Sequence, residues 1–214
     1  MATATLWKGV SIAMQSAIGS NLTISAITKA SPGVVTSTAH GLSNGDYVFL
    51  QVQGMHQLQD RVVRVANVAA DTFELEGVDT SGFDTFSSGT AAEITFGTSI
   101  TSATSMSGSD AGFDMIDTTT IHASQKSEVP GLPGSKTYTF DNIWDPTDAG
   151  QVAMKTASDS QAKRAFKFTF GTGGKVVVFA GYVGFSGAPG GSAQQLVTTQ
   201  AVITSQGSPT YYAS

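Results

Sequence analysis

The chain has 214 residues, which is enough for one large or two small domains with a proper core. Charged residues make up only 13% of it, whereas glycine occurs 24 times. This balance is typical of β-rich proteins with many turns, and of surfaces that pack against other subunits. The absence of cysteine excludes disulfides, thiolate catalysis and thiolate metal sites.

No apolar run approaches the ~18 residues of a membrane-spanning helix. Residues 1–8 lack the charged start and apolar stretch of a cleaved signal. We therefore expect a protein that is soluble when made, with no membrane insertion.

The net charge of −5 lies in one segment. Residues 28–95 hold three basic and eight acidic side chains, whereas the rest of the chain holds eight of each. This asymmetry predicts an inserted module at residues 28–95, between residues 1–27 and residues 96–214 of a discontinuous main domain. Lys and Arg are nowhere clustered as a surface that grips DNA requires.

Short strands bounded by turn residues dominate the first half of the chain. Phe73 and Leu75 alternate with Glu74 and Glu76, as in a strand that is buried on one face. The strands are predicted at residues 22–27, 34–36, 47–52, 61–65 and 72–76. Their close, regular spacing predicts a small β-barrel or sandwich.

A low-complexity stretch of Ser, Thr, Gly and Ala follows at residues 98–112, and residues 122–134 are polar with two prolines and two glycines. We interpret residues 105–134 as mostly a long, mobile excursion. Such long loops in compact domains are uncommon and are usually functional or disordered.

One helix is predicted, with Asp145 as the N-cap and Pro146 at the first helical position. It should end near residues 158–159. Its apolar face is predicted to consist of Ala149, Val152, Ala153 and Thr156, at spacings i, i+3, i+4 and i+7.

A hairpin follows the helix. Phe166, Phe168 and Phe170 alternate with polar residues, residues 171–174 form a glycine-rich turn, and residues 175–183 return. The return strand is apolar on both faces, so both faces should be buried. A glycine-rich loop at residues 186–192 then leads to a last strand at residues 195–205.

No catalytic, cofactor-binding or metal-binding constellation is found. His40, His56 and His122 are far apart in the sequence, and His40 is better explained as part of a turn. Asp114 and Asp117 could form a carboxylate pair but are better explained as local hydrogen-bond acceptors. The glycines of residues 131–137 lack the spacing of a phosphate-binding loop. The aromatic side chains of residues 166–182 fit a hydrophobic core better than a nucleic-acid stacking face.

The second half of the chain carries an ordered series of segments. Tyr138-Thr139-Phe140 and Trp144-Asp145-Pro146 lead into the predicted helix. Strands at residues 164–168, 178–183 and 198–204 follow, and the series closes on Gly207-Ser208-Pro209. In order and spacing it resembles the tail tube proteins of long, non-contractile-tailed bacteriophages. Upstream, residues 113–119 and 128–132 resemble the segment that precedes it in that family.

The resemblance implies a β-sandwich or barrel with one flanking helix, without enzymatic activity or cofactor. It implies six copies per ring and stacked rings that form a tube through which DNA passes without tight binding. Other expected partners are the tape measure, tip and terminator proteins of the tail. The expected location is the virion tail, assembled in the host bacterial cytoplasm. Residues 28–95 resemble a small β-barrel module first described in ubiquitin-activating enzymes, without that activity.

The segment at residues 105–134 is the candidate contact between rings. The residues expected to make it are Ser105, Gly108, Phe113, Asp114, Ile116, Asp117, Glu128 and Leu132. Two alternatives stay open. One is a low-copy tail-tip or fibre-like protein whose inserted module binds a host surface. The other is a wall-degrading enzyme, which would need a carboxylate pair or metal cluster that the sequence does not display.

Overall fold

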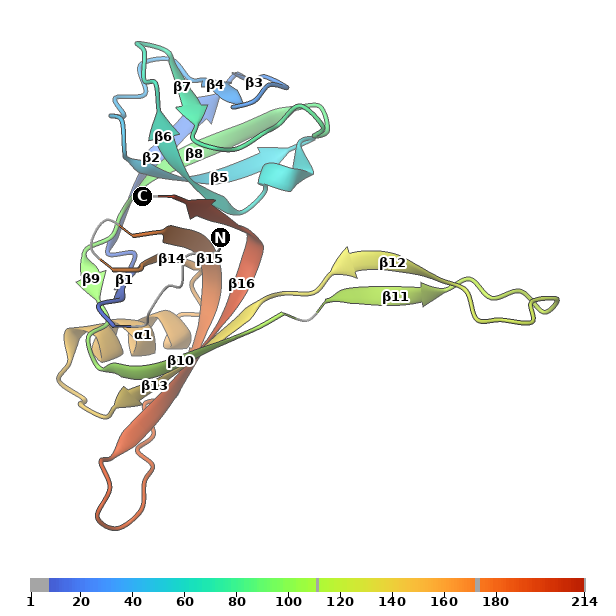
Figure 1. The fold of residues 1–214 in the computed structure, drawn as a ribbon. Coiled ribbons are helices and arrows are strands. Elements are labelled where there is room, and N and C mark those ends of the chain that lie inside the picture. The colour runs from blue at the N-terminus through green and yellow to red at the C-terminus, as the bar shows by residue number, and fades with distance from the viewer. Residues whose placement is uncertain (1–7, 111, 172–173, 214) are drawn as a thin grey trace.

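The computed structural model describes residues 8–110, 112–171 and 174–213, in which β-strands dominate and α1 (Ala149–Asp159) is the one α-helix (Figure 1). This confirms the expected mainly β fold with one flanking helix. Three predictions extend beyond the described residues. They are the turn at residues 171–174, the start at residues 1–8 and the long segment at residues 105–134, of which residue 111 is not described.

A seven-stranded antiparallel sheet forms the main body, here called the large sheet. Its order is β10 (Ala103–Ser109), β13 (Thr137–Ile143), β16 (Thr198–Tyr212), β15 (Val176–Phe185), β14 (Arg164–Thr169), β1 (Ser11–Met14) and β9 (Thr98–Ser99). The sheet curls into a half-barrel around an aromatic core (Figure 1). Phe166, Phe168 and Phe179 are at most 1% exposed, which confirms that these rings are core residues.

The predicted hairpin is confirmed as β14 and β15, which pair from Arg164↔Gly181 to Thr169↔Val176. The last strand differs from expectation. β16 begins at Thr198 instead of residue 195 and continues through Gly207 to Tyr212. The pairing of β16 with β15 shifts register between Val178 and Ala180, where β16 has extra residues around Gly207. Beyond this shift the two strands pair again, with Val176 beside Tyr212.

Helix α1 packs against the concave side of the large sheet, next to β15 and β9. Its close approach depends on Gly150, where a Cβ atom would lie 2.8 Å from the carbonyl oxygen of Ser99. The predicted end of the helix is confirmed, since α1 ends at Asp159.

The predicted start of the helix is wrong. Asp148 is the N-cap, and its carboxylate accepts the Gln151 amide hydrogen at 2.9 Å. Asp145 instead closes a local turn, in which its carboxylate accepts the backbone amide and the hydroxyl of Thr147. Pro146 therefore lies before the helix, in that turn.

The predicted inner face of the helix is also wrong. The residues that α1 buries are Gly150, Gln151, Met154 and Ala157. Gln151 can be buried because its amide donates to the Ile143 carbonyl and accepts from the Asp145 backbone. Val152 is consequently left 49% exposed.

A second seven-stranded sheet forms the small barrel above the large sheet (Figure 1). Its order is β2 (Ala17–Ile24), β8 (Ser88–Thr95), β5 (Tyr47–Gln53), β6 (Arg61–Ala66), β7 (Thr72–Leu75), β4 (Val34–Thr36) and β3 (Ala26–Ile27). The edge strands β2 and β3 are separated only by Ser25, so the sheet curls round on itself. Phe73 and Leu75 are fully buried, as their alternation predicts. β2 and β3 lie before residue 28, the expected start of the inserted module.

An apolar layer joins the small barrel to the convex face of the large sheet. Val62 and Ile94 come from the barrel, whereas Val176 and Val178 come from β15. The opposite side chains of β15 enter the aromatic core, so both faces are buried over residues 176–181, as predicted. Beyond them the prediction is wrong, because Tyr182 is 42% exposed and is not a core residue.

Polar contacts border the junction. The Tyr212 hydroxyl accepts the Arg64 amide hydrogen at 2.5 Å, and the Thr210 hydroxyl donates to the Val62 carbonyl at 2.9 Å. The Lys163 ammonium lies 2.8 Å from the Asp60 carboxylate.

A two-stranded ribbon of β11 (Phe113–Asp117) and β12 (Glu128–Pro133) projects from the body as an extension of β10 and β13 (Figure 1). We call residues 113–133 the arm. The predicted long excursion is present but is largely a paired ribbon, because Ile116↔Val129 and Asp117↔Glu128 pair across it; its mobility stays a prediction. The Thr118 backbone and hydroxyl both donate to Ser127, so only the tip of the arm is irregular.

Candidate assembly surfaces

The arm carries a concentration of exposed apolar side chains. These are Phe113, Met115, Ile116, Ile121, Val129 and Leu132, with Ile121 95% exposed and Leu132 81% exposed. A two-stranded ribbon has no core of its own in which to bury such side chains. A concentration of exposed apolar side chains on one projecting element indicates a contact with another protein.

The structure divides the predicted contact residues between the body and the arm. Ser105 and Gly108 lie on β10, within the large sheet. The other six lie on the arm: Phe113, Asp114, Ile116 and Asp117 on β11, and Glu128 and Leu132 on β12. The Asp117 carboxylate accepts the amide of Thr119 and its pKa is lowered by hydrogen bonds from that residue, so it is a local acceptor. Glu128 pairs with Lys126 at 2.5 Å.

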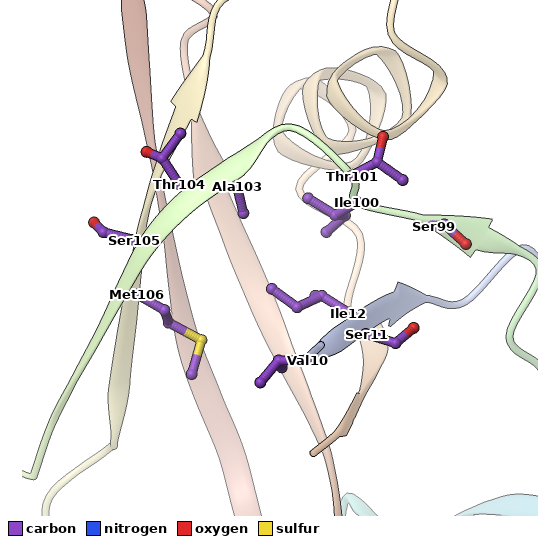
Figure 2. A pocket seen from close by; sticks show the side chains of 10 residues that line it. All are labelled: Val10, Ser11, Ile12, Ser99, Ile100, Thr101, Ala103, Thr104, Ser105 and Met106. Atoms are coloured by element: carbon purple, nitrogen blue, oxygen red, sulfur yellow. The ribbon is translucent and has the colours of Figure 1, made fainter. Parts of the chain in front are cut away.

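A cavity of about 580 Å³ opens where the two edges of the curled large sheet approach each other. Figure 2 shows its lining, with Val10 and Ile12 from the β1 side facing Ala103 and Met106 on the β10 side. Its wall contains no titratable side chain. Sequence reasoning missed this cavity, because residues 10–12 lie about ninety residues before residues 103–106, and the pairing of β1 with β9 brings them together.

β10 and β9 form the two edges of the large sheet. Edge strands present unpaired backbone amides and carbonyls to which a strand of another chain can be added. The seam between them therefore combines an apolar cavity with unpaired backbone, which suits contact with another subunit.

The outer face of β10, β13 and β16 is polar but almost uncharged. Asp141 is the one charged residue on these three strands. Its carboxylate accepts hydrogen bonds from the Ser105 hydroxyl at 2.6 Å and the Gln200 amide at 3.1 Å, which lower its pKa. No cation on these strands could hold a phosphate.

The histidines have structural or exposed positions and do not meet. His40 is buried and joins two segments, because Nδ1 accepts the Leu42 amide hydrogen and Nε2 lies 3.0 Å from the Ala69 carbonyl oxygen. This confirms its place in a turn. In residues 8–110, 112–171 and 174–213, no three His, Asp or Glu side chains are grouped to hold a metal ion. Within the same ranges, no helix is long and apolar enough to cross a membrane.

Comparison with known proteins gives one family. No curated protein matches the chain. A family model described as "Phage tail tube protein, TTP" matches residues 53–214, about three quarters of the chain. The match includes the large sheet from β9 onward, α1 and the arm, and it begins at the end of β5 in the small barrel. The chain therefore belongs to the phage tail tube protein family and is a non-enzymatic structural component of the virion tail.

Proposed function

We propose that this subunit assembles into stacked rings, six copies to a ring, which form the conduit for DNA ejection. The observation that carries this proposal is the arm, an apolar ribbon that projects from the body and has no partner within the described chain. In a tube subunit such a ribbon can extend to the neighbouring ring and bury its apolar side chains there.

The arm offers enough apolar surface for a lasting contact. Full burial of one large apolar side chain contributes about 1.5–3 kcal/mol. Six side chains that are half to almost fully exposed would together contribute on the order of 10 kcal/mol before association costs. Ordering the arm would consume part of this, which would keep free subunits soluble until a nucleating tip is present.

The edges of the large sheet support closure within a ring. If β10 of one copy pairs with the opposite edge of the next, the sheets continue into one another around the ring. Heterologous contacts of this kind generate closed rings when the rotation closes.

The neutral outer face of β10, β13 and β16 supports DNA passage. Tight DNA binding depends on Lys and Arg contacts with phosphates, and each contact would retain the passing strand. A wall of hydroxyl and amide groups with one carboxylate would let the duplex slide.

The small barrel is the proposed inserted module, and the sheet pairing supports an extent from Ala17 to Thr95 rather than a start at residue 28. We propose that its acidic surface faces outward, since eight carboxylates in an interface would be costly to desolvate. The proposed partners are further copies of the chain and the tape measure, tip and terminator proteins, with assembly in the host cytoplasm.

Negative-stain electron microscopy of the concentrated protein tests this function. The expected result is hollow rods or stacked rings, and arm variants Ile116→Ser and Leu132→Ser should give single rings or free subunits. The copy number in the virion distinguishes the tube subunit, which should be abundant, from the alternative of a low-copy tail-tip protein. A handful of copies per particle would overturn the tube assignment.

Hydrogen exchange tests the role of the arm directly. Amides of residues 113–133 should exchange faster in free subunits than in tubes, because assembly would bury the ribbon. Equal protection of the arm in both states would mean that it does not form the contact between rings.

A further inference from the structure

Helix α1 presents a second exposed apolar surface, on the main body. Its outward face, here called the α1 ridge, consists of Val152 and Thr156, with the half-buried Ala153 at its edge, where that side chain also packs against the aromatic core. These residues follow the helical spacing of a buried face, yet the monomer buries the other side of the helix. Val152 is 49% exposed and Thr156 is also exposed. An apolar helical face that the subunit itself does not cover needs a partner.

The α1 ridge separates two hollows. One, of about 280 Å³, is lined by Trp144, Val152 and Phe185 among others. The second, of about 360 Å³, is lined by Ile18, Ala153 and Arg164 among others, and Ile18 is 51% exposed. Thr156 borders both. A ridge with a hollow on each side can receive the side chains of an extended ribbon lying along it.

We infer that the α1 ridge and its two hollows receive the arm of a second copy of this chain, an inference that rests on the proposed tube function. The arm leaves the body on the side away from α1, so it points away from its own helix (Figure 1). A copy placed further along the direction of the arm presents its ridge to it. Donor and acceptor patches on opposite sides of one subunit are what open-ended head-to-tail stacking requires.

The reach and charge of the arm agree with this arrangement. The strands of the arm have five and six residues and span roughly 17–20 Å, and the tip at residues 118–127 extends beyond them toward a neighbouring body. The arm has a net charge of −2, from Asp114, Asp117 and Glu128 against Lys126. Lys155 borders one hollow but pairs with Asp159, whereas Arg164, which borders the other, has no ion pair among the described residues and can meet the acidic arm.

Cross-linking tests the pairing, because the natural chain has no cysteine. Two variants, Ile116→Cys and Thr156→Cys, are purified separately, mixed, assembled and treated with a short bismaleimide. We expect a covalent dimer in the mixture and in neither variant alone. A matched mixture of Ile116→Cys with Tyr211→Cys, an exposed residue outside the α1 ridge, should stay uncross-linked. Dimers from the control mixture only would overturn the inference.

A charge placed on the ridge tests its importance. Val152→Asp should lower the amount of sedimentable tube about tenfold or more, because assembly would bury a carboxylate against an arm whose net charge is −2. Val152→Ile and the matched variant Tyr211→Asp should assemble like the natural chain. An exposed site should not affect folding, and an unchanged melting temperature of the free subunit verifies this.

The outcomes separate the two proposals. If the natural chain forms tubes and Val152→Asp does so equally well, the ridge is not the acceptor, although the tube function stands. If the natural chain forms no rings or tubes even with tail tips added, the tube function fails and the inference fails with it.

Discussion

Replacing Tyr212 with Phe should loosen the junction between the small barrel and the large sheet. Tyr212 is 5% exposed, and its hydroxyl accepts the backbone amide hydrogen of Arg64 at 2.5 Å. The Phe variant keeps the ring, which lies 4.5 Å from the Arg64 guanidinium, and removes only the acceptor. Leaving a partly buried amide without a partner costs about 1–2 kcal/mol. In a chain of this size the melting temperature should fall by about 2–8 °C.

Thermal and urea denaturation of the free subunit measure this effect, with Tyr212→Ala as the comparison. Loss of the ring from the apolar layer should raise the cost to about 3–5 kcal/mol. The hydrogen bond would have no importance if Tyr212→Phe melted like the natural chain. If both variants cost the same, the hydroxyl alone would hold the junction and the packing argument would be refuted.

Three further predictions concern the helix cap, a close backbone contact and alkaline pH. Asp148→Ala removes the N-cap acceptor and should cost about 0.5–2 kcal/mol in urea unfolding, whereas Asp145→Ala should cost less. Gly207 has φ of +66°, and an added Cβ atom would lie 2.9 Å from the Asp60 carbonyl oxygen, so Gly207→Ala should lower the melting temperature. Burial raises the pKa of Tyr138 from 10.0 to about 12, so folding favours its protonated form. That stabilisation is complete below pH 10 and should be lost between pH 10 and 12, less steeply in Tyr138→Phe, as melts across this range would show.

The junction holds the two sheets in one body through apolar packing rather than through many ion pairs. Val176 and Val178 face the small barrel, while Phe179 on the same strand enters the aromatic core of the large sheet. β15 is therefore shared by two apolar layers. Because β15 packs against the small barrel on one face and the aromatic core on the other, packing as well as the chain connections holds the small barrel against the large sheet.

The sequence by itself determined the elements with a strong local pattern. Alternation of apolar and charged residues placed Phe73 and Leu75 inside the small barrel, and the alternating phenylalanines identified the β14–β15 hairpin. The order of segments in the second half was sufficient to indicate the tail tube family, which the family match confirms. These features depend on neighbours within a few residues, which a sequence displays directly.

Only the tertiary structure decided the choices that local pattern leaves open. Asp145 and Asp148 can both cap a helix, and the path of the chain after β13 gave that role to Asp148. Two faces of α1 could be buried, and Gln151 faces inward because backbone groups outside the helix satisfy its amide. Residues 105–134 lack a strong strand pattern, yet two strands of the arm pair across the ribbon. The seam cavity and the α1 ridge depend on how a sheet curls and which face a helix turns inward, and both follow from contacts between residues far apart in the sequence.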